Sequence, residues 1–382
     1  MRIALVTESF APDVNGVAHS VVRTAEHLIR TGHEPIVIAP VPAPGPVAAA
    51  PPYPVVRIPS VPMPGYPQIR LGLPLPALRT AIRRHRADVV HLASPFVLGA
   101  WAQAAARSLS LPSVAVYQTD VAAYARARNL GYGEQASWHW IRRLHNAATR
   151  TLAPSTASVR ALQRHGVERV HLWRRGVDDV RFHPDRRSDG IRRALCPGDE
   201  VLVGFVGRLA VEKEVHLLAA VSKMPRVRLV IVGDGPARAE LRRALPAATF
   251  LGARHGDQLA RIYASLDVFA HTGPFETFGQ TVQEAMASGV PVVAPAKGGP
   301  LDLVNPGQTG FLVPPHESGG FTDAVRHLAA DPALRRRLGA GGRAAIAGRS
   351  WAVVGDQLLH HYAEVLGTAS PGRVTLRTAA AA

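Results

Sequence analysis

Short, continuous apolar runs are the feature that most restricts how this chain of 382 residues can fold. Continuous apolar runs of strand length are typical of parallel sheets covered on both faces, whereas alternating runs leave one face wet. In the first half the runs are IALVTE at 3–8, EPIVIAP at 34–40, ADVVHLAS at 87–94 and PSVAVYQT at 112–119. Helical patterns separate them, as where Val17, Val21 and Ala25 precede Leu28. The first half is therefore predicted to be a doubly wound α/β domain.

A second series of the same kind begins near Val201. Its runs are VLVGFVG at 201–207, VRLVIVGDG at 227–235, ATFLG at 248–252, LDVFAHT at 266–272 and VPVVAP at 290–295. We predict an α/β fold with two doubly wound Rossmann-like domains, 1–180 and 181–350, which face each other across a cleft because such sheets bind ligands beyond the carboxyl ends of their strands. The last helix and tail, 351–382, could pack back on the N-terminal domain. The proline-rich segment 40–67 is predicted to be an extended loop.

The formal net charge of +16 would suit a nucleic acid, an anionic lipid or a phosphorylated small molecule as partner. The arginines are scattered in short groups over several predicted helices, which is equally typical of solvated helix faces. No nucleic-acid-binding module is recognisable, and the aromatic residues are not interleaved with the arginines. We therefore expect no nucleic-acid partner, and a basic nucleic-acid-binding protein is the weakest of the alternatives.

The N-terminal stretch is too short in apolar residues for a secretory leader, and no apolar run reaches the roughly 20 residues of a membrane span. The single cysteine, Cys196, excludes an intrachain disulfide. We expect a cytoplasmic protein that at most rests on the inner face of the membrane. The motif WHWIRRLHNAATR could form an interfacial helix through Trp138, Trp140, Arg142 and Arg143, although the tryptophans could equally belong to the core.

Two glutamates, Glu276 and Glu284, stand eight positions apart, a poor spacing for a pair on one helical face. Thr277 and Gln280 form a capping-box pattern, which predicts a helix over 278–288 that ends at Gly289. Glu276 is then expected on the loop before the helix and Glu284 about two turns inside it. The free amides at such a helix start favour an anion such as phosphate.

This arrangement suits a nucleotide sugar. The diphosphate would lie at the start of the helix, one carboxylate would accept ribose hydroxyls, and the other would accept a hydroxyl of the transferred sugar. The alternative is an acidic surface loop and a helix-face glutamate without a ligand. The donor-binding candidates on this segment are Glu276, Phe278, Gly279, Gln280, Thr281 and Glu284.

The same segment also resembles a known family. The two glutamates are followed by GVPVVAPAKGGPLDLV and GFLVPP, and GRLAVEKEVHLL, LVIVGDGP and PDVNGVAHSV occur elsewhere. Together they resemble the retaining glycosyltransferases of family four, which have the GT-B fold, and in particular the actinobacterial GDP-mannose-dependent α-mannosyltransferases that act on lipid acceptors. The resemblance implies a nucleotide-diphosphate sugar, GDP-mannose, as co-substrate, with no cofactor and no required metal. No Asp-x-Asp metal clamp is present in the chain.

The resemblance also implies roles for particular residues. Arg208 and Lys213 would neutralise the donor diphosphate, and together with Glu276 and Asp120 they are the catalytic candidates. Such cations stabilise the charge that grows on the departing nucleotide. Val211 stands where relatives often have proline, which should change loop stiffness and leave the charges intact.

Candidates in the N-terminal half follow the ends of its strands. Gly16 would expose amides to the donor diphosphate, and Asp13, Asn15, Thr119 and Asp120 are the acceptor-binding candidates. A plain helix-entry turn and a helix cap are the competing explanations. No catalytic histidine can be assigned, and His91 is expected to be a buried structural residue.

The favoured function is the transfer of mannose from GDP-mannose to a lipid or glycolipid. A transferase that uses a related GDP-sugar or another nucleotide sugar with a small soluble acceptor is the main alternative, because the donor motifs hardly separate the two. A nucleotide-sugar epimerase with the same fold is a third, and it would turn over its UDP-sugar without an acceptor.

Overall fold

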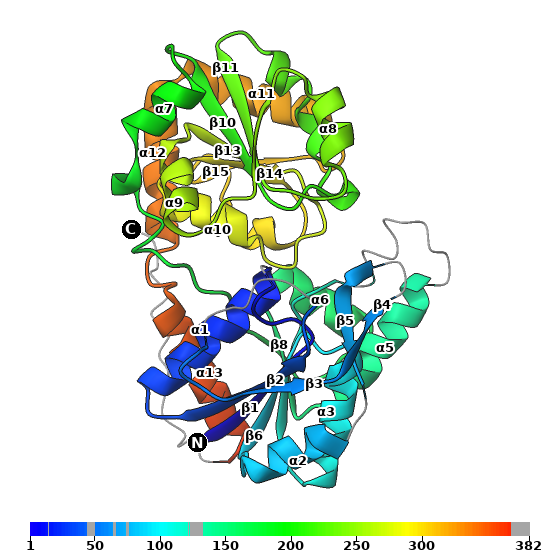
Figure 1. Cartoon of the computed structure of the whole chain (residues 1–382). Coiled ribbons are helices and arrows are strands. Elements are labelled where there is room, and N and C mark those ends of the chain that lie inside the picture. Colours follow the sequence, from blue (N-terminus) through cyan, green and yellow to red (C-terminus); the bar gives the residue numbers. More distant parts are fainter. Residues whose placement is uncertain are drawn as a thin grey trace.

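The computed structural model describes residues 1–13, 15–43, 50–63, 66–73, 76–120, 122 and 133–367. It has two large parallel sheets, one in each half of the chain (Figure 1). The N-terminal sheet has the order β3-β2-β1-β6-β7-β8-β9, and the C-terminal sheet has the order β12-β11-β10-β13-β14-β15. Both the α/β class and the two-domain arrangement are therefore as the apolar runs predict.

The strands of the N-terminal domain are β1 Arg2–Thr7, β2 Glu34–Pro40, β3 Val55–Ile58, β4 Ser60–Met63, β5 Tyr66–Gly72, β6 Val89–Ala93, β7 Ser113–Val116, β8 Arg150–Ala153 and β9 Val170–Leu172. Its helices are α1 Gly16–Arg30, α2 Pro76–Arg84, α3 Val97–Ser108, α5 Gly133–Ala147 and α6 Thr156–Arg164. The large sheet has apolar clusters on both faces, so its strands are buried from both sides.

The strands of the C-terminal domain are β10 Val201–Val206, β11 Val227–Val232, β12 Thr249–Gly252, β13 Val268–Ala270, β14 Val292–Pro295 and β15 Gly310–Val313. Its helices are α7 Asp189–Leu195, α8 Arg238–Ala244, α9 Gly256–Ser265, α10 Gln280–Ala287, α11 Ser318–Ala330 and α12 Pro332–Ala345. Short 3-10 helices are η1 Pro184–Arg186, η2 Val211–Lys213, η3 Val215–Leu218, η4 Val221–Lys223 and η5 Gly299–Asp302. None of the helices in the described part of the chain is long and apolar enough to cross a membrane.

The prediction of a loop over 40–67 is wrong. The segment contains β3, β4 and the start of β5. Proline cannot donate to a sheet ladder, but edge strands tolerate it. β3 is the outermost strand of its sheet, and β4 and β5 form a separate antiparallel pair in which Pro62 lies opposite Arg70.

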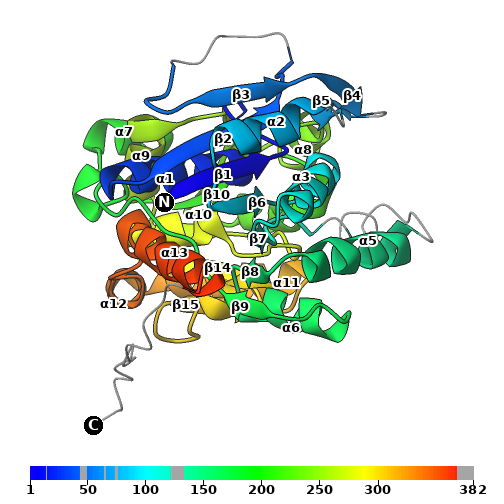
Figure 2. The same ribbon diagram turned by 90° about the horizontal axis from the view of Figure 1, so that it is seen from below.

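The last helix, α13 (Trp351–Val365), returns to the N-terminal domain and packs against α1 (Figure 2). The approach is close, because a Cβ on Gly355 would lie 2.4 Å from the His27 ring. The Tyr362 hydroxyl lies 2.7 Å from Nδ1 of His91, which is buried and structural as predicted. Burial lowers the pKa of His91 to about 3, so this ring is neutral.

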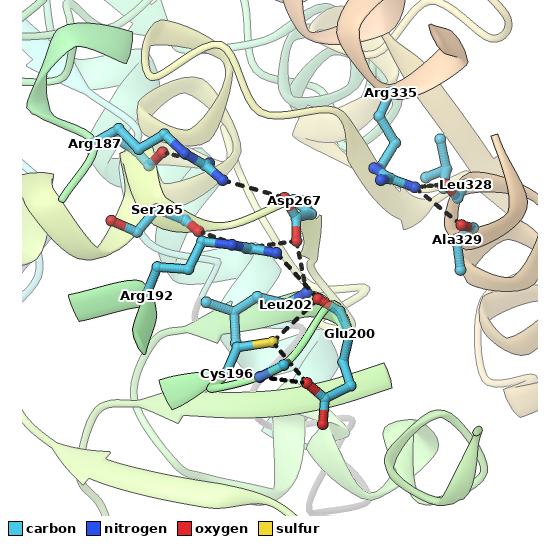
Figure 3. A network of polar contacts seen from close by, with 12 residues as sticks. Arg187, Arg192, Cys196, Glu200, Leu202, Ser265, Asp267, Leu328, Ala329 and Arg335 are labelled. Carbon is cyan, nitrogen blue, oxygen red and sulfur yellow. Dashed lines mark hydrogen bonds and ion pairs between the residues drawn. The ribbon is translucent and has the colours of Figure 1, made fainter. Parts of the chain in front are cut away.

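Several arginines make hydrogen bonds and ion pairs within the fold and are therefore not the solvated side chains that the charge pattern suggested. In Figure 3, Arg192 of α7 reaches Asp267, which also accepts a hydrogen bond of 2.8 Å from the Leu202 amide of β10. The same network contains Cys196, whose Sγ lies 3.0 Å from the Glu200 carbonyl oxygen. It lies where β10 and β13 begin, at the opposite end of the sheet from the candidate site.

Candidate functional site

The N-terminus of helix α10 lies at the junction with the N-terminal domain and has no side-chain cap. It begins at Gln280, and its N-cap is Gly279, which has φ +96 and therefore favours glycine. The predicted capping box and the start at 278 are wrong, because the Thr277 hydroxyl donates instead to the Gln118 carbonyl oxygen across the domain junction, at 2.9 Å. Glu276 lies on the loop and Glu284 on the helix, as predicted. The first-turn amides are left without a side-chain cap, a favourable environment for an anion.

The loop after β10 carries two cations, Arg208 and Lys213. Lys213 forms an ion pair with Glu276, and both side chains are largely buried. Burial alone would raise the pKa of Glu276, but Lys213, His271 and Arg175 bring it below the ordinary value, so the carboxylate is ionised. Arg208 is half exposed and pairs with the buried Glu212. The structure thus brings Lys213 and Glu276 together, with Arg208 nearby in sequence on the same loop.

Glu284 has a different environment from Glu276. Burial raises the pKa of Glu284 to about 7, although the neighbouring Tyr263, Gln280 and Arg175 oppose this shift. Only 8% of the residue is exposed. A carboxylate that is largely dehydrated and without a paired cation gains from hydroxyl donors that satisfy its oxygens.

Arg175 is a residue of the site that the sequence analysis missed. Its guanidinium donates to Gln118 Oε1 at 2.8 Å and to the Gly16 carbonyl oxygen, while its own carbonyl oxygen accepts from Gln283 of α10 at 3.2 Å. Burial lowers the pKa of Arg175 to about 10, against the attraction of Glu284 and Glu276. Arg175 lies in the stretch 173–190, whose sequence has no periodicity and therefore gives no signal for its role.

Two further glycines hold the Glu276 loop. The Gly299 amide donates to the Glu276 carbonyl oxygen at 2.8 Å. A Cβ on Gly298 would lie 2.4 Å from that same oxygen, and one on Gly299 would lie 2.0 Å from the Phe278 carbonyl oxygen. The Gly-Gly pair in AKGGP was the available signal for this close backbone contact.

The helix-entry residues of the N-terminal domain are linked to one another. Asn15 caps α1 by accepting from the Val17 and Ala18 amides, each at 3.0 Å, and donates to Ser9 Oγ at 2.8 Å. Ser9 in turn donates to Asp13 at 2.6 Å. These contacts give Asn15 a structural role, and its part in acceptor binding stays a prediction.

Thr119 and Asp120 follow β7, as the apolar run predicts. Thr119 Oγ1 accepts from Ser94 Oγ at 3.0 Å. Gly16 begins α1, and its carbonyl oxygen contacts Arg175, which places the start of α1 at the junction. The roles of Gly16, Thr119 and Asp120 in binding stay predictions.

A cavity of about 380 Å³ lies in the N-terminal domain beside Thr119. Its walls come from the segments that follow β6 and β7 and from α5. Glu8 supports one wall, because its Oε1 accepts from the Phe96 and Gly99 amides at 3.0 and 2.9 Å at the start of α3. This buried carboxylate was not singled out from the sequence, where it is only the residue after a strand.

Helix α5 contains the motif expected to meet a membrane. Trp138 is 8% exposed and its ring stacks on His165 at 3.7 Å, so it belongs to the core and not to an interface. Trp140 is partly buried, and Arg142 and Arg143 are exposed. Of these four residues, only Trp140, Arg142 and Arg143 are therefore accessible to a membrane surface.

No group of three His, Cys, Asp or Glu side chains could hold a metal ion within the residues that the structure describes. Two parallel α/β domains whose strand ends meet, with the Lys213–Glu276 ion pair beside the uncapped start of a helix at their junction, have the architecture of GT-B glycosyltransferases. Comparisons with known proteins agree with this class.

The family model described as Glycosyltransferase Family 4 matches residues 14–181, and the model described as Glycosyl transferases group 1 matches residues 200–331. A GDP-mannose-dependent alpha-mannosyltransferase of Mycobacterium tuberculosis is 50% identical over 371 residues, which are 96% of this chain and 97% of that protein. The protein of the same name from Mycolicibacterium smegmatis is 49% identical over 97% of this chain and 99% of its own length. The structure of sucrose-phosphate synthase from Thermosynechococcus elongatus has a TM-score of 0.78 at 22% identity and covers 96% of this chain and 100% of that one. The chain belongs to glycosyltransferase family 4.

Proposed function

We propose that the protein transfers mannose from GDP-mannose to a lipid or glycolipid acceptor, with retention of anomeric configuration and without a metal ion. One observation carries the choice of donor: relatives called GDP-mannose-dependent alpha-mannosyltransferase match at about half of all positions over almost the whole chain. The geometry supports a nucleotide sugar in general, because an uncapped helix start, Lys213 and Glu276 lie together.

In this proposal the diphosphate lies at the start of α10, where the amides of Phe278 to Thr281 and the side chains of Arg208 and Lys213 offset its charge. These groups stabilise the leaving nucleotide as its charge grows. Glu284 accepts hydrogen bonds from the ribose hydroxyls, and Glu276 accepts one from a hydroxyl of the sugar.

The acceptor approaches from the N-terminal domain, past Asp13, Asn15, Thr119 and Asp120. If the acceptor is a lipid, the protein works at an anionic membrane surface that Arg142 and Arg143 can contact.

The test is a thermal-shift screen of GDP-mannose, GDP-glucose, UDP-glucose and the free nucleotides, followed by mass spectrometry of reactions with candidate acceptors in excess chelator. We expect GDP and GDP-mannose to stabilise the protein most, and an α-mannoside to form with chelator present. Stabilisation by UDP-sugars alone would contradict the donor, and loss of transfer in chelator with recovery in magnesium or manganese would contradict the metal-free mechanism.

A further inference from the structure

We propose that the cavity between α3 and α5 binds the hydrocarbon part of the acceptor. The inference rests on the proposed function, in that it assigns a place and a chemical class to the acceptor of that transferase. It concerns the cavity of about 380 Å³ in the N-terminal domain, a volume within the range of roughly 300–1,000 Å³ that is usual for small-molecule sites.

Among the residues that the structure describes, the walls of the cavity carry no charged side chain. The described lining residues are apolar, aromatic, hydroxyl-bearing, amide or histidine, in a chain of formal charge +16. Phe96, Val97, Trp140 and Ile141 are among its apolar lining residues. The histidine, His145, has its pKa lowered to about 4 by burial, so the ring is neutral. A charged or polyhydroxylated group would lose its hydration here without compensation, whereas a hydrocarbon chain would gain from burial.

Three polar side chains of the wall are already engaged within the protein, whereas the buried Nε2 of Gln118 has no hydrogen-bond partner among the described residues. Ser94 donates to Thr119 at 3.0 Å, Ser137 donates to the Gly133 carbonyl oxygen at 2.6 Å, and His145 Nδ1 lies 3.2 Å from Thr151 Oγ1. A polar ligand that enters the cavity would therefore find few partners to replace the hydrogen bonds that it makes with water. This favours an apolar occupant over a sugar or an inositol.

The cavity also lies next to the transfer site. Gln118 and Thr119 line its edge. The Gln118 carbonyl oxygen accepts from Thr277, the residue that follows Glu276, and its side chain accepts from Arg175. An acceptor with its tail in the cavity would thus hold its head group beside the loop that carries Glu276, which is the position that sugar transfer requires.

Hexyl, octyl and decyl β-D-glucopyranosides, below their micelle concentrations, test this assignment by calorimetry on the whole protein. Affinity should rise with chain length, by up to about fourfold for each methylene group that becomes buried. Ala136→Phe places a ring at the edge of the cavity from an exposed position on α5 and should weaken decyl glucoside binding at least tenfold, with GDP binding unchanged. Ala104→Phe makes the same change at an exposed position of α3 outside the cavity and should leave both ligands unaffected. Trp140→Ala removes a wall without adding bulk and should also flatten the dependence on chain length.

Equal affinity for the three glucosides, or decyl glucoside binding that survives Ala136→Phe, would overturn the assignment. GDP binding and GDP-mannose turnover, measured on the same preparations, separate this failure from that of the proposed function. A protein that uses GDP-mannose but ignores chain length refutes the cavity assignment alone. A protein that selects long chains but binds no GDP supports the cavity and refutes the proposed donor.

Discussion

At the scale of single residues, the two glutamates of the site have the same chemistry but opposite environments. Glu276 is ionised because Lys213, His271 and Arg175 outweigh its burial. At Glu284 burial outweighs the opposing effects of Tyr263, Gln280 and Arg175 and raises the pKa to about 7. This difference supports the proposed roles, in which Glu276 binds a hydroxyl of the reacting sugar and Glu284 accepts hydrogen bonds from the nucleotide hydroxyls.

The first prediction separates these roles. Glu284→Ala should weaken binding of GDP and of the donor by roughly 1.5–3 kcal/mol, since a set of charged hydrogen bonds is lost. Glu276→Gln should lower kcat by more than it weakens GDP binding, because its interaction strengthens towards the transition state. Calorimetry with GDP and steady-state kinetics measure both effects. If Glu276→Gln kept kcat and lost GDP affinity, or if Glu284→Ala bound GDP normally, the nucleotide would not lie along α10 as proposed.

The second prediction concerns pH. Ribose hydroxyls donate to the ionised form of Glu284, so nucleotide binding must remove its proton when the pH is below the free pKa of about 7. The dissociation constant for GDP should therefore be flat above pH 7 and rise as the pH falls, by at most about tenfold per unit. The terminal phosphate of GDP titrates near pH 6 as well. Glu284→Gln keeps only that contribution, and superimposable pH profiles for the variant and the natural protein would contradict the assignment.

At the scale of elements, the short helix η2 positions Lys213. Its first residue, Val211, is 72% exposed, and the preceding Ala210 is extended, with φ −139 and ψ 158. That is the conformation required of a residue before proline, and the first position of a helix accepts proline well. The backbone at this position thus suits proline as well as valine, and the expected change in loop stiffness stays a prediction.

The third prediction follows from this geometry. Val211→Pro should raise the free energy of unfolding of the C-terminal domain by about 0.4–1 kcal/mol, because it restricts the unfolded chain without disturbing Lys213. Denaturant unfolding measures the change, and Val211→Ala is the control for loss of the side chain. A destabilised Val211→Pro protein would mean that the backbone at Val211 differs from a normal helix start.

At the scale of the whole molecule, a few polar contacts hold the two domains at their junction. Asp302 of η5 accepts from the Thr156 amide at 2.8 Å and from its hydroxyl, at the start of α6. Ser158 donates to the Thr277 carbonyl oxygen at 3.2 Å, and Thr277 donates to Gln118. Thr277 is thereby fixed from both sides, and Glu276 precedes it directly.

The fourth prediction is that Asp302→Ala loosens this junction. Two hydrogen bonds to a carboxylate that is 5% exposed are lost, and the Thr156 amide loses its partner, at a cost of roughly 1–3 kcal/mol. Small-angle scattering should show a larger radius of gyration, and kcat/KM for the donor should fall, while circular dichroism stays unchanged. Asp323→Ala, which removes an exposed carboxylate far from the junction, should change neither quantity. Unaltered scattering and kinetics in Asp302→Ala would show that the other contacts suffice.

The sequence by itself determined the periodic features and the local motifs. Continuous apolar runs predicted nine of the strands and the parallel sheets, since burial on both faces leaves that mark on each strand separately. The positions of Glu276 on a loop and Glu284 on a helix, and the end of that helix near Gly289, also followed from neighbours in the chain. The proline-rich segment was misjudged because proline marks an edge strand and a loop in the same way.

Only the tertiary structure decided which distant residues meet. Thr277 looked like a helix cap, but a carbonyl group from the other domain competes for its hydroxyl. Trp138 could have faced a membrane, yet it is covered by His165. Arg175 lies in a stretch without a sequence pattern. Its place in the site depends on its hydrogen bonds to Gln118 and Gly16 and on the attraction of the two glutamates, all of which are distant in sequence. Local sequence records the propensity of each segment, whereas burial, pKa and hydrogen-bond competition depend on neighbours that only the folded chain supplies.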